Sequence, residues 1–174
     1  ALPPGIALTA VNDRAMARAA EVPNRGWYFD YLLLEKHRLK DSTPMTPAMS
    51  LIYALDYQID RMLAEGLENR FARHSAMAKY SQEWAMKKGW PLFAPEGYRS
   101  QTITVVVNPP TFDCGEFNKF VAPRNLRLAN GYGDMKGKTF RIAHMAEIQM
   151  SDLENLLCGI DEFMQGSQYD IQPG

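Results

Sequence analysis

The chain has 174 residues, of which 46% are hydrophobic and 22% charged, a composition typical of a soluble globular protein with a real core. Its net charge of −1 offers no attraction to nucleic acid or to an anionic membrane, and no apolar run approaches the ~20 residues that span a bilayer. Cys114 and Cys158 lie far apart without metal-ligand spacing, which predicts free thiols in a reducing cytoplasm and no metal site.

The first part of the chain predicts one strand and two short helices. Residues 5–11 follow a Pro-Pro-Gly bend and are rich in apolar residues, so they are expected to form a strand. Asn12 offers an N-cap for an alanine-rich helix over residues 14–20, and an aromatic-rich helix is expected over residues 28–36. Because only helix and loop follow it, the strand is expected to be the last one of a sheet whose other members are missing.

Two long helices are predicted next. A proline-stiffened loop over residues 40–47 leads into the first, with Thr46 as N-cap and Pro47 in the first turn. Its apolar residues recur at helical spacing: Met49, Ile52, Leu55, Ile59, Met62 and Leu63. An exposed apolar face of this kind predicts self-association. A second helix is expected over residues 67–88, with Gly89 as its stop.

The second half of the chain predicts a small sheet with two further helices. Strands are expected over residues 90–94, 102–107, 126–129 and 137–145. Helices are expected over residues 114–121 and from a capping box at Ser151–Glu154 onward. This order predicts an α/β or α+β fold, in which a small sheet is covered on one face by helices and preceded by two long helices.

Arg141 lies in the middle of a strand whose other residues favour burial. An unpartnered charge is costly to bury, and the guanidinium fork matches a planar carboxylate through two parallel hydrogen bonds. Arg141 is therefore expected to form an internal ion pair with Glu147 or Asp134, or to bind an anionic ligand.

The three histidines have no ligand spacing. His74 lies among basic residues on a long helix and is expected at the surface, whereas His144 is expected in the core, on the face opposite to Arg141.

In order, these segments resemble the C-terminal half of the class V pyridoxal-phosphate aminotransferases, the group of the alanine–glyoxylate, serine–pyruvate and phosphoserine aminotransferases. The resemblance runs from Pro3 to about Met164. Its most specific pieces are the Pro-Pro-Gly turn at residues 3–5, Ser42-Thr43-Pro44 before residues 50–55, Glu65-Gly66-Leu67-Glu68, and residues 137–145.

The resemblance implies the C-terminal part of a fold-type-I pyridoxal-phosphate transferase. Residues 1–45 would be a remnant of the large cofactor-binding domain, residues 46–65 a linking helix, and residues 66–174 the C-terminal small domain. In that family the Pro-Pro-Gly turn follows shortly after the lysine that holds the cofactor. This chain begins at Ala1, so it is expected to lack that catalytic lysine and to be an inactive fragment when alone.

The resemblance also implies site residues. Arg141 matches the arginine that holds the α-carboxylate of the substrate, and Thr43 matches a threonine that contacts the cofactor phosphate of the neighbouring subunit. The alternative for Thr43 is a helix-entry turn in which it caps only its own backbone. Gly131, Tyr132 and Gly133 are expected to form either a flexible loop over the substrate entrance or a tight turn between two strands.

The expected parent is a cytoplasmic, homodimeric enzyme that binds pyridoxal 5′-phosphate. It would transfer an amino group from a small amino acid (alanine or serine) to a 2-oxo acid (glyoxylate or pyruvate). The alternative is a non-catalytic dimerisation or interaction module without the cofactor lysine. A cysteine desulfurase is disfavoured, because neither cysteine lies in a recognisable catalytic loop.

Overall fold

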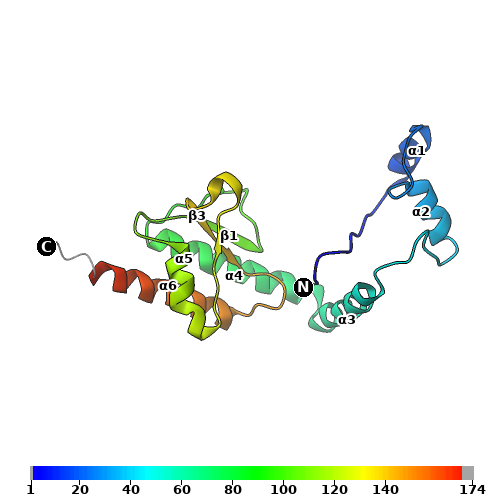
Figure 1. Cartoon of the computed structure of the whole chain (residues 1–174). Coiled ribbons are helices and arrows are strands. Elements are labelled where there is room, and N and C mark those ends of the chain that lie inside the picture. Colours follow the sequence, from blue (N-terminus) through cyan, green and yellow to red (C-terminus); the bar gives the residue numbers. More distant parts are fainter. Residues whose placement is uncertain (1, 170–174) are drawn as a thin grey trace. The chain divides into compact units, whose positions relative to one another are not determined.

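The computed structural model describes residues 2–169 (Figure 1). Side chains are described up to residue 166. The chain divides into two compact units, Ala1–Ala64 and Glu65–Gly174. The assignment of residues 1–45, 46–65 and 66–174 to a large-domain remnant, a linking helix and a small domain stays a prediction.

The first unit begins with two short helices, α1 (Asp13–Glu21) and α2 (Tyr31–Arg38). Asn12 caps α1, because its side-chain oxygen accepts the N–H of Ala15 at 2.9 Å. Asp30 caps α2 and also accepts the Nε–H of Arg25 at 2.9 Å. Because the Asp30 side chain accepts the N–H of Leu32 in the first turn, α2 begins at Tyr31, three residues later than predicted.

The predicted strand over residues 5–11 is not formed within this chain, and its place as the last strand of a sheet with missing members stays a prediction. This segment is extended but pairs with no other strand among the described residues. A strand is defined by the neighbour that receives its hydrogen bonds, so an apolar sequence alone does not make one.

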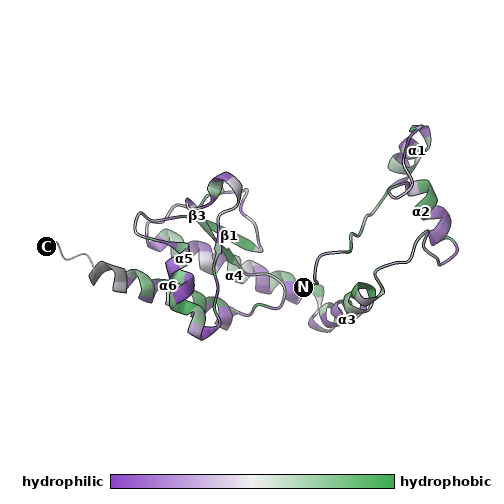
Figure 2. Ribbon diagram, in the orientation of Figure 1, coloured by the Kyte–Doolittle hydropathy of each residue, from purple (hydrophilic) through white to green (hydrophobic). Residues whose placement is uncertain are grey.

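Helix α3 (Met49–Glu65) follows the proline-containing loop, and its last residue belongs to the second unit. Residues Leu51 and Ile52 both donate to the Ala48 carbonyl, at 3.0 Å each, so the helix starts after Pro47 and the predicted Thr46 cap is wrong. Hydrophobic and hydrophilic residues are mixed along α3 (Figure 2). Several of its apolar side chains are exposed, among them Ile59 at 42%.

The second unit holds a three-stranded antiparallel sheet in the order β1-β3-β2 and three helices. Its strands are β1 (Ile103–Val107), β2 (Ala129–Asn130) and β3 (Thr139–Ala143). Its helices are α4 (Leu67–Lys87), α5 (Cys114–Val121), α6 (Met150–Tyr169) and the short 3-10 turns η1 (Ala122–Arg124) and η2 (Gly133–Met135). The predicted fold class is confirmed.

The core lies between one face of the sheet and the helices. Val106 is opposite Phe140 in the register of β1 and β3, and both side chains are fully buried. They belong to one hydrophobic cluster with Met77 of α4, Phe117 of α5 and Ile160 of α6. Because side chains alternate along a strand, Arg141, the residue after Phe140, points to the other face of the sheet.

Tryptophan residues occur in both units in different settings. Trp84 and Trp90 pack edge to face with ring centroids 5.2 Å apart, and Trp90 packs in the same way on Phe140. Trp27 of the first unit is 57% exposed.

Several element boundaries differ from the prediction because local hydrogen bonds decide them. Residues 90–94 form only a single β-bridge, between Leu92 and Val106. The strand predicted over 126–129 is shortened to β2, which shares only Ala129 with the prediction. Helix α6 begins before the predicted capping box. The N–H of Gln149 donates to the Asp152 carboxylate at 2.9 Å, so Asp152 performs the reaching-back role that was assigned to Glu154.

Candidate functional site

Arg141 lies at the centre of the sheet surface that faces away from the helices. Its neighbours in the register are Val105 on β1 and Ala129 on β2, whose aliphatic side chains cannot pair with a charge. The guanidinium is half-buried, and its Nε–H donates to the backbone carbonyl of Asn130 at 2.8 Å. Neither terminal nitrogen hydrogen-bonds to a described residue.

The internal partners predicted for Arg141 are engaged elsewhere or do not reach it. Glu147 lies 3.4 Å from Arg70, and Asp134 forms no ion pair with Arg141 among the described residues. The internal ion-pair alternative is therefore wrong for this part of the chain. Arg141 is therefore a half-buried cation whose two terminal nitrogens, which have no described partner, can bind an anion.

The loop beside Arg141 is tightly built at its base and open at its tip. Gly131 is buried, and a Cβ added to it would lie 2.0 Å from the carbonyl oxygen of Met135, so only glycine fits there. Tyr132 is 84% exposed, and Gly133 takes a φ of +55° at the start of η2. The predicted turn at residues 131–133 is thus a constrained loop base that carries one exposed aromatic ring.

The sequence analysis did not identify Asn130 as a residue that supports this site. Its Oδ1 accepts the N–H of Gly131 at 2.8 Å and the N–H of Gly137 at 2.9 Å, which ties the two ends of the loop together. Its carbonyl holds the Arg141 side chain. An Asn-Gly pair next to a strand is the only sequence signal for this role, and it indicates a turn without showing which side chain the turn supports.

Thr43 lies in the first unit, in the loop after α2. Its hydroxyl donates to the carbonyl of Met45 at 2.6 Å, the local contact of a helix-entry turn. The side chain is exposed, and the Thr43 N–H has no hydrogen-bond partner among the described residues. The free donor at this position is therefore the backbone N–H, and the hydroxyl proton is already engaged.

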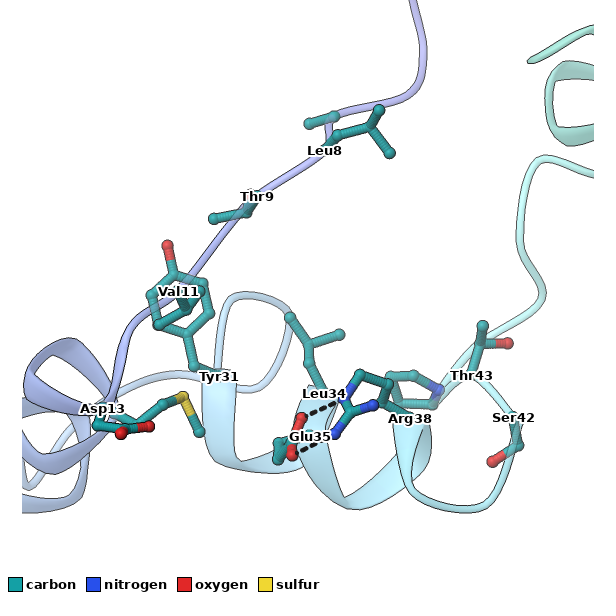
Figure 3. Close-up of a pocket in the computed structure, with 13 residues that line it drawn as sticks. Leu8, Thr9, Val11, Asp13, Tyr31, Leu34, Glu35, Arg38, Ser42 and Thr43 are labelled. Carbon is teal, nitrogen blue, oxygen red and sulfur yellow. Dashed lines mark hydrogen bonds and ion pairs between the residues drawn. The ribbon is translucent and has the colours of Figure 1, made fainter. Parts of the chain in front are cut away.

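A cavity of about 850 Å³ lies beside this loop, within the first unit. The extended segment with Leu8 and Thr9 forms one side of it, and α2 with Tyr31 and Leu34 forms the other (Figure 3). Thr43 lines its rim. Two charged residues of the cavity wall pair with each other, because Arg38 forms a bidentate ion pair with Glu35 at 2.6 and 2.8 Å. The Arg38 hydrogen bond lowers the pKa of Glu35.

The histidines behave differently from one another. His144 is fully buried as predicted, and its Nε2 lies 2.9 Å from the Thr104 hydroxyl, which in turn lies 2.8 Å from Ser81 Oγ. The expectation of a fully satisfied core histidine is only partly met, because its Nδ1 is buried without a described hydrogen-bond partner. Burial lowers the pKa of His144, because the charged imidazolium loses its hydration. The prediction of a solvated His74 is wrong, since its ring is half-buried and its Nε2 is enclosed without a described partner.

A four-residue ion cluster fixes the start of α4. Glu65 accepts hydrogen bonds from Arg73 Nε and Arg70 Nη1, each at 2.7 Å, and Arg70 also reaches Glu147. Arg73 donates to the carbonyl of Ala146 at 2.9 Å. The hydrogen bond from Arg73, strengthened by that from Arg70, lowers the pKa of Glu65 to about 2. The cluster joins the start of α4 to the loop between β3 and α6.

Other kinds of site find no support in the described part of the chain. Its histidine, cysteine and carboxylate side chains nowhere gather in a group of three that could hold a metal ion. The two thiols are unpaired, with Cys114 buried and Cys158 exposed. Over residues 2–169 no helix has both the length and the apolar character needed to cross a membrane.

Most of the known proteins that the chain resembles are named aminotransferases, and two relatives are named soluble hydrogenase subunits. An uncharacterized aminotransferase of Methanocaldococcus jannaschii is 36% identical over 148 residues, which make up 83% of this chain and 38% of that protein. The serine–glyoxylate aminotransferase of Arabidopsis thaliana is 28% identical over 99% of this chain and 44% of its own length. No family model matches the chain.

A solved structure agrees with these relatives. The pyridoxamine–pyruvate aminotransferase of Mesorhizobium loti superimposes with a TM-score of 0.80 and 27% identity, over 91% of this chain and 42% of that one. The chain therefore spans less than half the length of the proteins that it matches.

Proposed function

We propose that this chain is part of an enzyme that moves an amino group from a small amino acid to a 2-oxo acid. The chain belongs to the class V aminotransferases and matches the C-terminal part of their fold. Alanine or serine would be the donor, and glyoxylate or pyruvate the acceptor. The names of the relatives support this range of substrates, since they include serine, glyoxylate and pyruvate.

The observation that carries the proposal is the unpaired outer edge of Arg141. Every substrate of such a reaction carries a carboxylate next to the carbon that gains or loses the amino group. A half-buried guanidinium binds a carboxylate more strongly than an exposed one, because less water competes for it. Held in this way, the reacting carbon would keep one orientation while a bond to it is broken.

We also propose pyridoxal 5′-phosphate as the cofactor, with Thr43 as a contact of its phosphate across a homodimer interface. When bound, this cofactor acts as the electron sink of the reaction. The exposed loop and the free N–H of Thr43 fit a phosphate oxygen, and backbone N–H groups are common phosphate ligands. A bond from the hydroxyl would require it to leave the Met45 carbonyl. The unpaired thiols are consistent with a cytoplasmic enzyme.

Replacement of Arg141 tests the function in the full gene product that carries this chain. Arg141→Gln, which removes the charge, should raise the KM for amino acid and 2-oxo acid about 100-fold, and Arg141→Lys about tenfold, since lysine keeps the charge without the fork. Both should keep the circular dichroism spectrum. The measurement is steady-state kinetics with each substrate varied in turn.

Arg127→Gln is the matched control, because it removes the same charge from a residue that is exposed in the same unit and forms no ion pair with a described residue. Its KM values should not change. Unchanged kinetics in Arg141→Gln would show that Arg141 does not bind the substrate carboxylate.

A further inference from the structure

The guanidinium of Arg141 has two edges that can each bind a carboxylate through two hydrogen bonds. The end-on edge presents Nη1 and Nη2, and the side-on edge presents Nε and one Nη. The Nε–H of Arg141 already donates to the Asn130 carbonyl at 2.8 Å, whereas both Nη groups are without a described partner. The side-on edge is therefore closed and the end-on edge is open.

The acceptor of this hydrogen bond is held in place from several sides. The Oδ1 of Asn130 ties together the N–H groups of Gly131 and Gly137, and Gly131 also donates to the Thr139 carbonyl at 2.8 Å. The carbonyl of Gly137 accepts from Asn108 Nδ2 at 3.0 Å. A loop with this many fixed points keeps the Asn130 carbonyl directed at Arg141.

Packing prevents the loop base from tilting away. A Cβ at position 131 would lie 2.0 Å from the Met135 carbonyl oxygen and 2.6 Å from Thr139 Oγ1, so the backbone of the loop is already in close contact with β3. The Asn130 carbonyl cannot retreat without breaking these contacts.

We propose that the substrate carboxylate binds Arg141 end-on, through Nη1 and Nη2, and that Asn130 is the positioning residue that enforces this geometry. The inference rests on the proposed function, because it assumes that the ligand of Arg141 is a carboxylate. It goes further in stating which atoms bind and which residue decides this. The side chain of Asn130 acts through the loop and its carbonyl, without contact with the substrate.

Nitrogen NMR of arginine side chains tests the geometry directly. The full gene product is labelled with ¹⁵N at the arginine side chains, and the Arg141 signals are assigned by comparison with Arg141→Lys. On titration with pyruvate, the Nη signals should shift while the Nε–H signal keeps its position and its protection from solvent exchange. Shifts of Nε as large as those of Nη would overturn the end-on geometry and leave the proposed function intact. If no Arg141 signal moves at saturating pyruvate, the proposed carboxylate site itself fails, and this inference with it.

Substitution of Asn130 tests the positioning role. Asn130→Ala should speed the exchange of the Arg141 Nε–H at least tenfold and raise the KM for 2-oxo acid about tenfold, with a smaller change in kcat. Asn130→Asp keeps the Oδ1 acceptor and should restore the slow exchange, which a general loss of stability would not explain. Asn155→Ala, at an exposed position on α6, is the control and should change neither quantity. Slow Nε–H exchange in Asn130→Ala would show that Asn130 does not position Arg141. If this variant does not fold, the pyruvate titration of the unaltered protein still decides between end-on and side-on binding.

Discussion

At the scale of single residues, the surroundings of Gly131 show how strongly one position can depend on the absence of a side chain. The backbone of the loop passes so close to Met135 that there is no space for even a methyl group. By contrast, a Cβ at Gly166 on α6 would have no heavy atom within 4 Å.

We expect Gly131→Ala to lower the free energy of unfolding by about 2 kcal/mol, the cost of overpacking a close contact. Gly166→Ala is the matched control and should raise it by roughly 0.5 to 1 kcal/mol, because alanine is the better helix former. Urea unfolding followed by circular dichroism measures both. Equal effects of the two substitutions would contradict the close contact at Gly131.

Glu65 makes the stability depend on pH in the acid range. Its pKa is lowered from 4.5 to about 2 by the hydrogen bonds from Arg73 and Arg70. Since the folded pKa lies below the unfolded one, the stabilisation is present above pH 4.5 and is lost as the pH falls towards about 2.

Glu65→Gln should therefore be less stable than the natural protein near neutral pH, with a shallower loss of stability between about pH 5 and about pH 2. Urea unfolding at a series of pH values measures the two slopes. Glu154→Gln, at an exposed site without a described ion pair, should leave the slope unchanged. Parallel curves for Glu65→Gln and the natural protein would argue against the ion cluster.

At the scale of elements, helix boundaries follow from caps that the sequence only partly reveals. At the start of α6, both Ser151 and Asp152 are residues that favour a helix N-terminus. The structure uses Asp152, because its carboxylate reaches back to the Gln149 N–H. Ser151, which begins the predicted capping box, lies inside the first turn of α6.

Asp152→Ala should lower the free energy of unfolding by about 1 kcal/mol, the usual effect of losing a capping bond. Ser151→Ala should change it by less than half as much, since the Ser151 side chain is exposed and makes no hydrogen bond to a described residue. Thermal unfolding of the two variants decides between the two caps. A larger effect at Ser151 would restore the predicted capping box.

Prediction from sequence succeeded where an element is determined by its own residues. The helix over residues 114–121 matches α5 at both ends, and α4 differs from its prediction by one residue. Residues 5–11 stay undecided, because pairing depends on a partner strand that the described residues do not supply. For the site, the outward direction of Arg141 follows from strand alternation, but its contact with Asn130 is made by a backbone carbonyl, which leaves no trace in the sequence.

At the scale of the whole molecule, helix α3 exposes apolar residues that recur at helical spacing. Ile52, Ile59 and Leu63 are 40%, 42% and 63% exposed, and they recur along one helix. Contiguous apolar surface of this kind favours association.

The chain should therefore self-associate as its concentration rises, and Ile59→Asp should shift the equilibrium towards monomer at least tenfold, because a charge would be buried on association. Sedimentation velocity over a range of concentrations measures this. Ser50→Asp adds the same charge at an exposed position in the first turn of α3 and should have little effect. Equal dissociation by both would point to net charge alone as the cause.

The placement of the tryptophans has a consequence for optical measurements. The indole rings of Trp84 and Trp90 stack against the hydrophobic core, whereas Trp27 of the first unit is largely in water. The emission spectrum should therefore combine a blue-shifted component from residues 84 and 90 with a red, quencher-accessible component from residue 27. Fluorescence can thus follow the two units separately within one sample and show whether they melt together.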